Sequence, residues 1–228
     1  MELVQQDERY SALVLDTNPN RDTIDRMVKL LDARGFPRDQ VFTSKGTISQ
    51  QQFLEMLTYF LLKTKAGDRP AFFLNLHGGV HKGVPYISLG ETPITIPDLY
   101  LALNLVQGDK LLALYACHAG AANDYLRRRD IQEVSGKYCV ITSCRSDETT
   151  APSIWKSEGK SEISTVAALE MIAEKSPARR VDLSKVRDPF GLAYGRLFPF
   201  LDIFFDRLLG FQTPKNRFNR TANSSYLF

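Results

Sequence analysis

The chain has 228 residues, of which 43% are hydrophobic and 24% charged, as in one large globular domain or a domain with an extension. These proportions exclude collagen-like, low-complexity and wholly disordered chains, because a core of ordinary size can be buried. The formal net charge of +3 is far below the dense positive charge of a dedicated nucleic-acid-binding protein, so we expect no nucleic-acid partner.

The cysteines and the N-terminus indicate the cellular compartment. Three cysteines, an odd and small number, fit a reducing compartment better than a disulfide framework. No Cys/His cluster has the spacing of a zinc site, so we expect no bound metal. Residues 1–10 carry charges where a signal peptide has an apolar core, and no uncharged stretch reaches the roughly 18 residues that span a bilayer. We therefore expect a soluble, cytoplasmic protein.

Short apolar runs alternate along the chain with segments whose apolar residues recur at helical spacing. Continuous apolar strands separated by helices are typical of a mostly parallel sheet covered on both faces, so we predict a three-layer α/β/α sandwich. Such sheets bind their ligands at the carboxyl ends of the strands. The predicted strands are 10–15, 41–44, 71–76, 111–116 and 138–143, and the predicted helices are 23–36, 48–63 and 97–106.

Two of the predicted strands end in chemically reactive residues. His77 follows one strand and precedes two glycines, and Cys117 follows the next strand along the chain. A thiolate is the nucleophilic form of cysteine, and a nearby imidazole can take its proton and later protonate a leaving amine. The small neighbouring residues allow a substrate backbone to approach. Either residue alone would more often be structural, but together they form a candidate catalytic dyad.

Five segments of the chain carry a family resemblance: DARGFPRDQVF (32–42), FFLNLHGG (72–79), LLALYACHAG (111–120), TSCRSDETTA (142–151) and SEISTVAALEMI (161–172). In sequence and in order, they resemble the caspase, metacaspase and legumain superfamily of cysteine peptidases. The resemblance covers residues 10–175. It implies a caspase-like peptidase domain over 1–175, which hydrolyses a protein or peptide substrate through a thioester and needs no cofactor.

The roles of individual residues follow from the resemblance at matching positions. It makes His77 the general acid/base, Cys117 the nucleophile, and the N–H groups of Gly78 and Cys117 the oxyanion site. His81 and His118 are the alternative bases. His81 lies beyond the predicted strand end and precedes a lysine, and His118 directly follows the nucleophile, where successive side chains point apart. We therefore favour His77.

The residues that would recognise P1, the substrate residue before the cleaved bond, disagree in charge. Arg21 resembles a pocket arginine of caspases and legumains and favours an acidic or asparagine P1. Asp147 lies in the metacaspase-like segment and favours a basic P1. Tyr115 stands where relatives carry Asp, Glu or Gln and supplies no charge, while Lys156 would occupy the place of a caspase pocket arginine. We expect a basic P1, with an acidic or asparagine P1 as the alternative.

Two further features correspond to regulatory parts of metacaspases. The run Arg127–Arg129 lies where relatives are often processed, so it is either a self-cleavage site or an exposed helix face. Asp124 falls where some metacaspases place a calcium ligand. Calcium needs six to eight oxygen ligands, and residues 80–106 contain only Glu91 and Asp98 as further acidic residues, so we expect no calcium requirement.

The C-terminal part, 176–228, has a different pattern. Residues 197–211 place their large apolar side chains on one stripe with charged residues opposite, which predicts an amphipathic helix. We expect this helix to pack on the 1–175 domain or to form a homodimer or partner contact. Docking to a membrane surface is less favoured, because the polar face is as acidic as it is basic. Residues 212–228 are polar, and we predict a loop-like tail.

Two other functions remain as alternatives to a peptidase. A catalytically inactive caspase-like module would bind partners through the same crevice, but the intact dyad argues against it. An open-sheet binding protein of another class would be expected to carry a glycine-rich phosphate-binding loop, which this sequence lacks. We therefore predict a cysteine endopeptidase.

Overall fold

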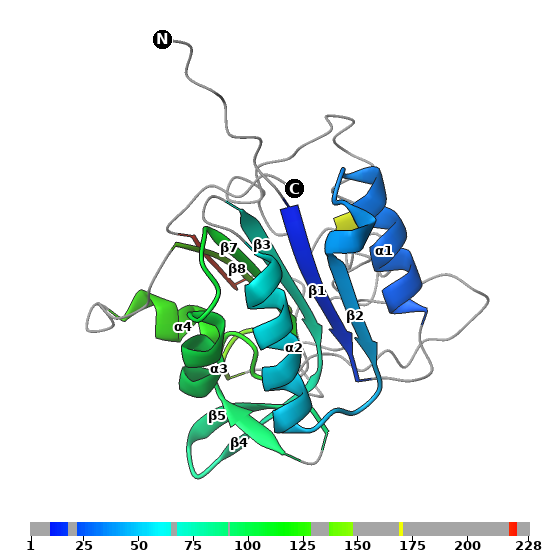
Figure 1. Cartoon of the computed structure of the whole chain (residues 1–228). Helices are drawn as coiled ribbons and strands as arrows, with labels where there is room; N and C mark the ends of the chain where they lie inside the picture. The colour runs from blue at the N-terminus through cyan, green and yellow to red at the C-terminus, as the bar shows by residue number, and fades with distance from the viewer. Residues whose placement is uncertain are drawn as a thin grey trace, which may run out of the picture.

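The computed structural model describes residues 10–17, 22–64, 68–90, 92–128, 137–147 and 169–170, together with the backbone of 219–222. A six-stranded sheet runs through the middle of the molecule (Figure 1) in the order β2-β1-β3-β7-β8-β9. The first five strands are parallel and β9 is antiparallel to β8. The strands are β2 (Val41–Lys45), β1 (Tyr10–Asp16), β3 (Arg69–Asn75), β7 (Lys110–Tyr115), β8 (Tyr138–Thr142) and β9 (Asn219–Ala222).

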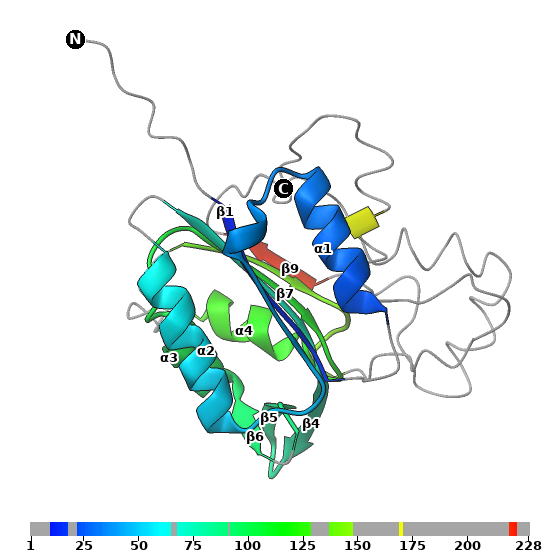
Figure 2. The same ribbon diagram turned by 45° about the vertical axis from the view of Figure 1, so that its right-hand side comes forward.

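Helices cover both faces of this sheet, which gives three layers (Figure 2) and confirms the predicted α/β class. Each face has its own core: Phe73 of β3 packs on the face of the first helix, and Phe72 packs on the opposite face. Side chains alternate between the faces along a strand, which is why strands buried on both faces are apolar throughout. One face carries α1 (Thr23–Ala33), and the other carries α2 (Gln50–Lys63), α3 (Ile96–Leu103) and α4 (Ala121–Arg127).

Polar side chains fix the points at which α2 and α3 begin. The Ser49 hydroxyl accepts a hydrogen bond from the Gln52 N–H (3.1 Å), and the Gln52 side chain accepts one from the Ser49 N–H (2.8 Å), which together form a capping box. The Thr95 hydroxyl accepts from the Asp98 N–H (3.3 Å) at the start of α3. Since α2 follows the carboxyl end of β2, its cap fixes a loop at the edge where ligands bind in such sheets.

A second sheet, which the sequence analysis does not predict, follows directly after β3. Its three antiparallel strands are β4 (His77–His81), β5 (Val84–Ser88) and β6 (Pro93–Thr95). Lys82 and Gly83 both have positive φ (49° and 79°), as the two-residue turn of a tight hairpin requires. Figure 1 shows this sheet at the end of the molecule toward which β1 and β2 point. His77 therefore begins a new strand and not a loop.

The described parts of the C-terminal half join the same domain. Leu169 packs into the core on the α1 face, and the carboxylate of Glu170 pairs with the guanidinium of Arg26. The prediction of a loop is wrong for 219–222, because these residues pair with β8 as the last strand of the sheet. An edge strand offers unpaired backbone groups, so even a polar segment can add to it. The predicted helix at 197–211 lies outside the described residues.

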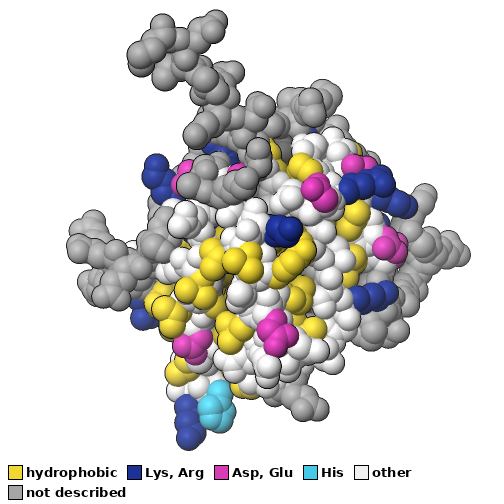
Figure 3. All heavy atoms as spheres, viewed as in Figure 1, with side chains coloured by type: hydrophobic (Ala, Val, Ile, Leu, Met, Phe, Trp, Pro, Cys, Tyr) yellow, Lys and Arg dark blue, Asp and Glu magenta, His cyan; other side chains and the backbone are white. Residues whose placement is uncertain are grey.

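The outer surface of α2 and α3 is more apolar than an ordinary exposed helix face. Figure 3 shows apolar side chains gathered over these two helices. The large exposed apolar residues of this region include Leu54 and Leu62 of α2, Leu101 of α3 and Leu105 just after α3. Both helices are therefore apolar on more than the face that the sheet buries. Within the ranges that the structure describes, no helix has the length and apolar character needed to cross a membrane.

Candidate functional site

His77 and Cys117 lie next to each other at the carboxyl edge of the central sheet. The last register pair between β3 and β7 is Asn75 with Tyr115, and the Leu76 N–H extends the ladder by donating to the Tyr115 carbonyl (2.9 Å). His77 and Cys117 each come two residues after that pair. Neighbouring strands are about 4.8 Å apart, so the main chains of the two residues lie close together at this edge. The prediction that they follow adjacent strands is confirmed.

The main chain at Gly78 is in direct contact with the main chain at Cys117. A Cβ atom placed on Gly78 would lie 2.1 Å from the carbonyl oxygen of Cys117 and 3.2 Å from the Cβ of Ala116. Any residue with a Cβ at position 78 would therefore have to displace the Cys117 carbonyl group. The glycine after His77 is therefore needed for the two strand ends to approach each other.

The three cysteines differ in exposure, and none forms a disulfide. Cys139 and Cys144 are fully buried, whereas Cys117 is half-buried. His77 is exposed at the start of β4. Cys117 is thus the thiol that a substrate or a soluble reagent can reach, and an imidazole is available at the same edge.

The residue before Cys117 is held by the loop that follows β8. The Ser143 hydroxyl lies 3.2 Å from both the N–H and the carbonyl oxygen of Ala116. The Cys144 thiol donates to the same carbonyl at 3.2 Å. Two side chains from the loop after β8 therefore fix the backbone that precedes the candidate nucleophile.

The two alternative bases occupy different surroundings. His81 lies at the hairpin tip opposite Val84, four residues along β4 from His77, which at about 3.3 Å per residue is roughly 13 Å away. His118 is half-buried, and its Nδ1 lies 2.9 Å from the carbonyl oxygen of Ser146. His81 therefore lies too far away to act at the site, and Nδ1 of His118 is already hydrogen-bonded to the loop after β8.

The P1 candidates are only partly brought together. Tyr115 is buried in the core on the α1 face at the end of β7. The side chain of Asp147 is 70% exposed. Its Oδ1 lies 3.3 Å from Nε of Arg145, whose positive charge partly neutralises the carboxylate. Arg21 and Lys156 lie outside the described residues. The described loop therefore presents a carboxylate near the site, although one that already has a cationic neighbour.

Two polar residues at the same edge escape the sequence analysis. Asp16 ends β1 in register with Asn75, and Asn75 is in register with Tyr115. Strand alternation places all three on the α1 face. Asp16 and Asn75 are buried, and Nδ2 of Asn75 has no hydrogen-bond partner in the described part of the chain. A buried donor of this kind can be satisfied by a ligand. The available signal was a polar residue at the end of each apolar run.

The metal and processing predictions remain predictions. Among the described residues, no three His, Cys, Asp or Glu side chains are grouped so that they could hold a metal ion. Asp124 lies in α4, where its carboxylate is 3.8 Å from the guanidinium of Arg127. Arg127 and Arg128 are exposed at the end of that helix, and Arg129 lies outside the described residues.

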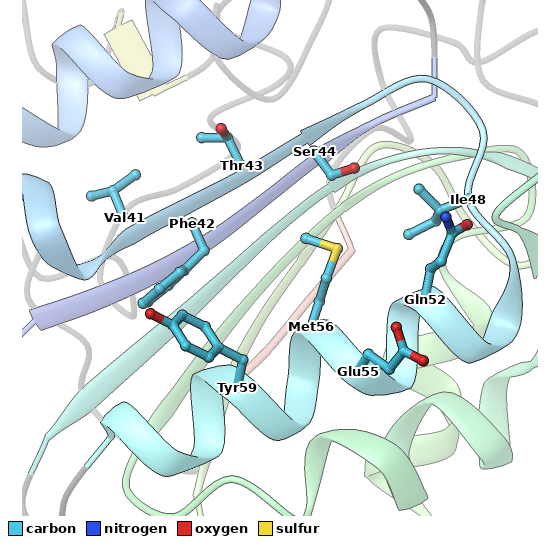
Figure 4. Close-up of a pocket in the computed structure, with 9 residues that line it drawn as sticks. All are labelled: Val41, Phe42, Thr43, Ser44, Ile48, Gln52, Glu55, Met56 and Tyr59. Carbon is cyan, nitrogen blue, oxygen red and sulfur yellow. The ribbon is translucent and has the colours of Figure 1, made fainter.

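A separate hollow of about 590 Å³ lies between β2 and α2 (Figure 4). Phe42, Met56 and Tyr59 form its apolar walls, and Gln52 and Glu55 add polar groups. Two strands, β1 and β3, separate β2 from β7 in the sheet. Neither residue of the dyad lines this hollow, so it is distinct from the candidate site.

No protein-family model and no curated protein matches the chain. Among solved structures, the chain is similar to Raptor from Chaetomium thermophilum, with a TM-score of 0.41 and 13% sequence identity. The match covers 75% of this chain and 19% of that chain, so this chain spans about a fifth of the length of Raptor. A likeness this weak carries no functional conclusion.

Proposed function

We propose that the chain is a cysteine endopeptidase of caspase-like fold, with Cys117 as nucleophile and His77 as general acid/base. The observation that carries this proposal is that both residues stand two positions beyond one register pair, just past the ends of the adjacent parallel strands β3 and β7, where the main chains meet at Gly78. The carboxyl edge of such a sheet is where ligands bind. Cys117 is partly exposed, whereas the other two cysteines are buried, and this difference also favours a reactive role for Cys117.

In the proposed reaction, the imidazole of His77 takes the thiol proton of Cys117, and the thiolate sulfur attacks the carbonyl carbon of the substrate. The N–H groups of Gly78 and Cys117 donate to the resulting oxyanion. The C–N bond then breaks, and the amine leaves with the proton from His77, so that a thioester remains on Cys117. Water, deprotonated by His77, hydrolyses the thioester and regenerates the thiol.

The proposed P1 residue is lysine or arginine. The carboxyl group of Asp16 stands in line with Asn75 and Tyr115 at the edge where the dyad lies, and Asp147 adds a second carboxylate from the loop after β8. A basic side chain entering there would form charge-assisted hydrogen bonds with these groups. An acidic or asparagine P1 is the alternative, and it depends on Arg21.

The first test measures the reactivity of the Cys117 thiol. Iodoacetamide labelling, followed by mass spectrometry of each cysteine peptide, should show fast and pH-dependent modification of Cys117. We expect His77→Ala to slow this labelling by about 100-fold, because the thiolate loses its proton acceptor. The matched control is His81→Ala, which removes a histidine at the hairpin tip and should leave the rate unchanged. Equal rates in the wild type and His77→Ala would contradict the dyad.

The second test measures peptide hydrolysis and reads the P1 preference directly. A peptide library incubated with the wild type should be cut after lysine or arginine, and Cys117→Ala should cut nothing. Cleavage after aspartate or asparagine would keep the peptidase and reject the basic P1. If no peptide is cut and labelling of Cys117 is slow in every variant, the chain is an inactive binding module instead.

A further inference from the structure

We propose that His118 is a positioning residue that ties the turn carrying Cys117 to the loop carrying Asp147, and so holds the nucleophile against the P1 wall. This inference rests on the proposed peptidase function and adds a residue to it. In this role the ring of His118 contacts no reacting atom. It acts through the backbone on both sides of the active centre.

The first observation is the backbone conformation of His118. Its φ is +59°, in the left-handed region that residues with a Cβ rarely adopt. Among the described residues other than glycine, Lys82 alone shares a positive φ, and Lys82 stands in a hairpin turn that requires it. Conformations of this kind persist where the surroundings hold them. Something must therefore hold the turn at His118.

The second observation is the contact made by the side chain. Nδ1 of His118 lies 2.9 Å from the carbonyl oxygen of Ser146, 28 residues later in the chain. A carbonyl oxygen can only accept, so Nδ1 carries the proton, and Nε2 keeps its lone pair in the neutral ring. The ring is half-buried, which shields this hydrogen bond from competing water.

The third observation is that the turn and the loop are packed backbone to backbone. A Cβ atom placed on Gly120 would lie 2.4 Å from the carbonyl carbon of Arg145 and 2.4 Å from the nitrogen of Ser146. The turn itself is closed by the Ala121 N–H, which donates to the His118 carbonyl at 3.1 Å. A movement of either segment would therefore displace the other.

Together these contacts bracket the nucleophile. Ser143 and Cys144 hold the residue before Cys117, and Ser146 holds the residue after it through the His118 ring. Ser146 also directly precedes Asp147. The one hydrogen bond thus links the position of the sulfur atom to the position of the P1 carboxylate. A displacement of about 1 Å between such groups can lower a rate by about 100-fold.

Three substitutions of His118 separate the hydrogen bond from backbone strain and from acid/base chemistry. In His118→Asn, the amide nitrogen stands as many bonds from Cα as Nδ1, and asparagine tolerates positive φ, so the tie is kept while Nε2 is lost. Glycine in His118→Gly adopts the positive φ without strain but has no side-chain donor. His118→Ala lacks the donor and adds strain. All three are measured for kcat/KM and for the rate of iodoacetamide labelling of Cys117.

We expect His118→Ala and His118→Gly to lose about 30-fold in both measurements, and His118→Asn to stay within about 3-fold of the wild type. The pH profile of kcat/KM should be unchanged in His118→Asn. If His118→Asn is as slow as His118→Ala and a limb of the pH profile disappears, the ring is a general base and the positioning role is wrong. If His118→Gly matches the wild type, the hydrogen bond has no positioning role.

A spectroscopic measurement separates this inference from the peptidase function. In wild-type protein with ¹⁵N-labelled histidine, the neutral His118 ring should be the Nδ1–H tautomer, and the Nε2–H tautomer would overturn the proposed tie. Iodoacetamide needs no P1 pocket, so labelling of Cys117 still tests positioning if no peptide is cut. A wild type that cuts no peptide, with the Nδ1–H tautomer and the expected labelling rates, rejects the peptidase and keeps the positioning role.

Discussion

The buried polar groups of Lys110 and Tyr138, at the amino end of the central sheet, have internal partners, whereas in the described part of the chain the amide donor of Asn75 at the carboxyl end does not. At the amino end, Nζ of Lys110 lies 3.0 Å from the Gly108 carbonyl oxygen and 5.1 Å from the centre of the Tyr138 ring, and the Tyr138 hydroxyl donates to Asn104 at 2.7 Å. At the carboxyl end, Asn75 keeps a buried amide donor with no partner among the described residues. Near the amino end of β1, Oγ of Ser11 is likewise buried without a partner among the described residues. A missing partner therefore indicates a binding site only where, as at Asn75, the side chain also lies beside other candidate site residues.

Both ends also use a glycine for close approach of two backbone segments. A Cβ on Gly78 would lie 2.1 Å from the Cys117 carbonyl oxygen, and a Cβ on Gly108 would lie 2.2 Å from the Asp68 carbonyl oxygen. The steric conflict is of the same size at the two ends. Only the contact at Gly78 involves a proposed catalytic residue. Substitutions of the two glycines can therefore distinguish an effect on activity from an effect on stability.

The largest effect is expected for Gly78→Ala. The added methyl group must push the Cys117 backbone away, and we expect kcat/KM for peptide hydrolysis to fall about 1000-fold in folded protein. Gly108→Ala is the matched control at the amino end. It should lower the free energy of unfolding by about 2–4 kcal/mol, because its φ of +94° adds strain to the same overlap.

In the control, kcat/KM per folded molecule should stay within a few-fold of the wild type. Circular dichroism at low temperature gives the folded fraction, to which the kinetics of each variant are referred. If Gly108→Ala lowers kcat/KM as much as Gly78→Ala does, the difference between the two ends is not one of function.

The next effect in size concerns the unsatisfied amide of Asn75. Leucine has nearly the same shape, so Asn75→Leu replaces a buried donor without a partner by an apolar group. We expect the free energy of unfolding to stay unchanged or to rise by about 0.5 kcal/mol, while KM for a peptide substrate rises about 10-fold, because a substrate carbonyl oxygen would lose this donor. Urea unfolding and steady-state kinetics measure the two quantities. A clear loss of stability with unchanged KM would make Asn75 a structural residue.

Tyr138→Phe should give the opposite pattern at the amino end. Removal of the hydroxyl leaves the Asn104 oxygen without this donor, and we expect the free energy of unfolding to fall by about 1 kcal/mol. kcat and KM should not change, because Tyr138 begins its strand and the candidate site lies at the opposite end of the strands. A change in KM comparable with that of Asn75→Leu would show that the two ends are coupled.

The parts of the fold that the sequence predicts are those built on buried apolar runs. Each parallel strand is covered on both faces, so it appears as a continuous apolar segment with little ambiguity. The small sheet lacks this signal, because β4 begins with HGG and is largely exposed. The last strand, β9, forms through backbone pairing with β8, which depends on a partner about 80 residues earlier in the chain. Neither is visible in local patterning.

The site shows the same division. His77 and Cys117 are predictable because each directly follows an apolar run, and such ends meet at one edge of a parallel sheet. Asp16 and Asn75 are single polar residues at the ends of their strands. Their proximity to Tyr115 depends on register, which hydrogen bonding between distant segments determines. The sequence pattern therefore locates His77 and Cys117 but not the polar residues that lie beside them.

The smallest effect is a pH dependence at the amino end. Burial lowers the pKa of Lys110 from 10.5 to about 8, an effect that the charge of Asp109 partly offsets. Below pH 8 both the folded and the unfolded chain carry the charged lysine, and the folded state bears the full cost of burying it. Between pH 8 and 10.5 the folded state has released a proton that the unfolded state still binds, so this group makes stability rise with pH.

Lys110→Met removes the buried charge while keeping a side chain of similar length. We expect it to raise the free energy of unfolding by about 1 kcal/mol at pH 7, less than the full pKa shift implies, because the Gly108 carbonyl loses its donor. The difference from the wild type should shrink as the pH approaches 10.5, as urea unfolding at pH 7 and pH 10 would show. A methionine variant that is less stable at pH 7, or a difference that is the same at both values, would mean that the partners of Lys110 fully compensate its burial. In that case the charge of Lys110 would be as well satisfied as the Tyr138 hydroxyl, which would widen the contrast between these two residues and Asn75.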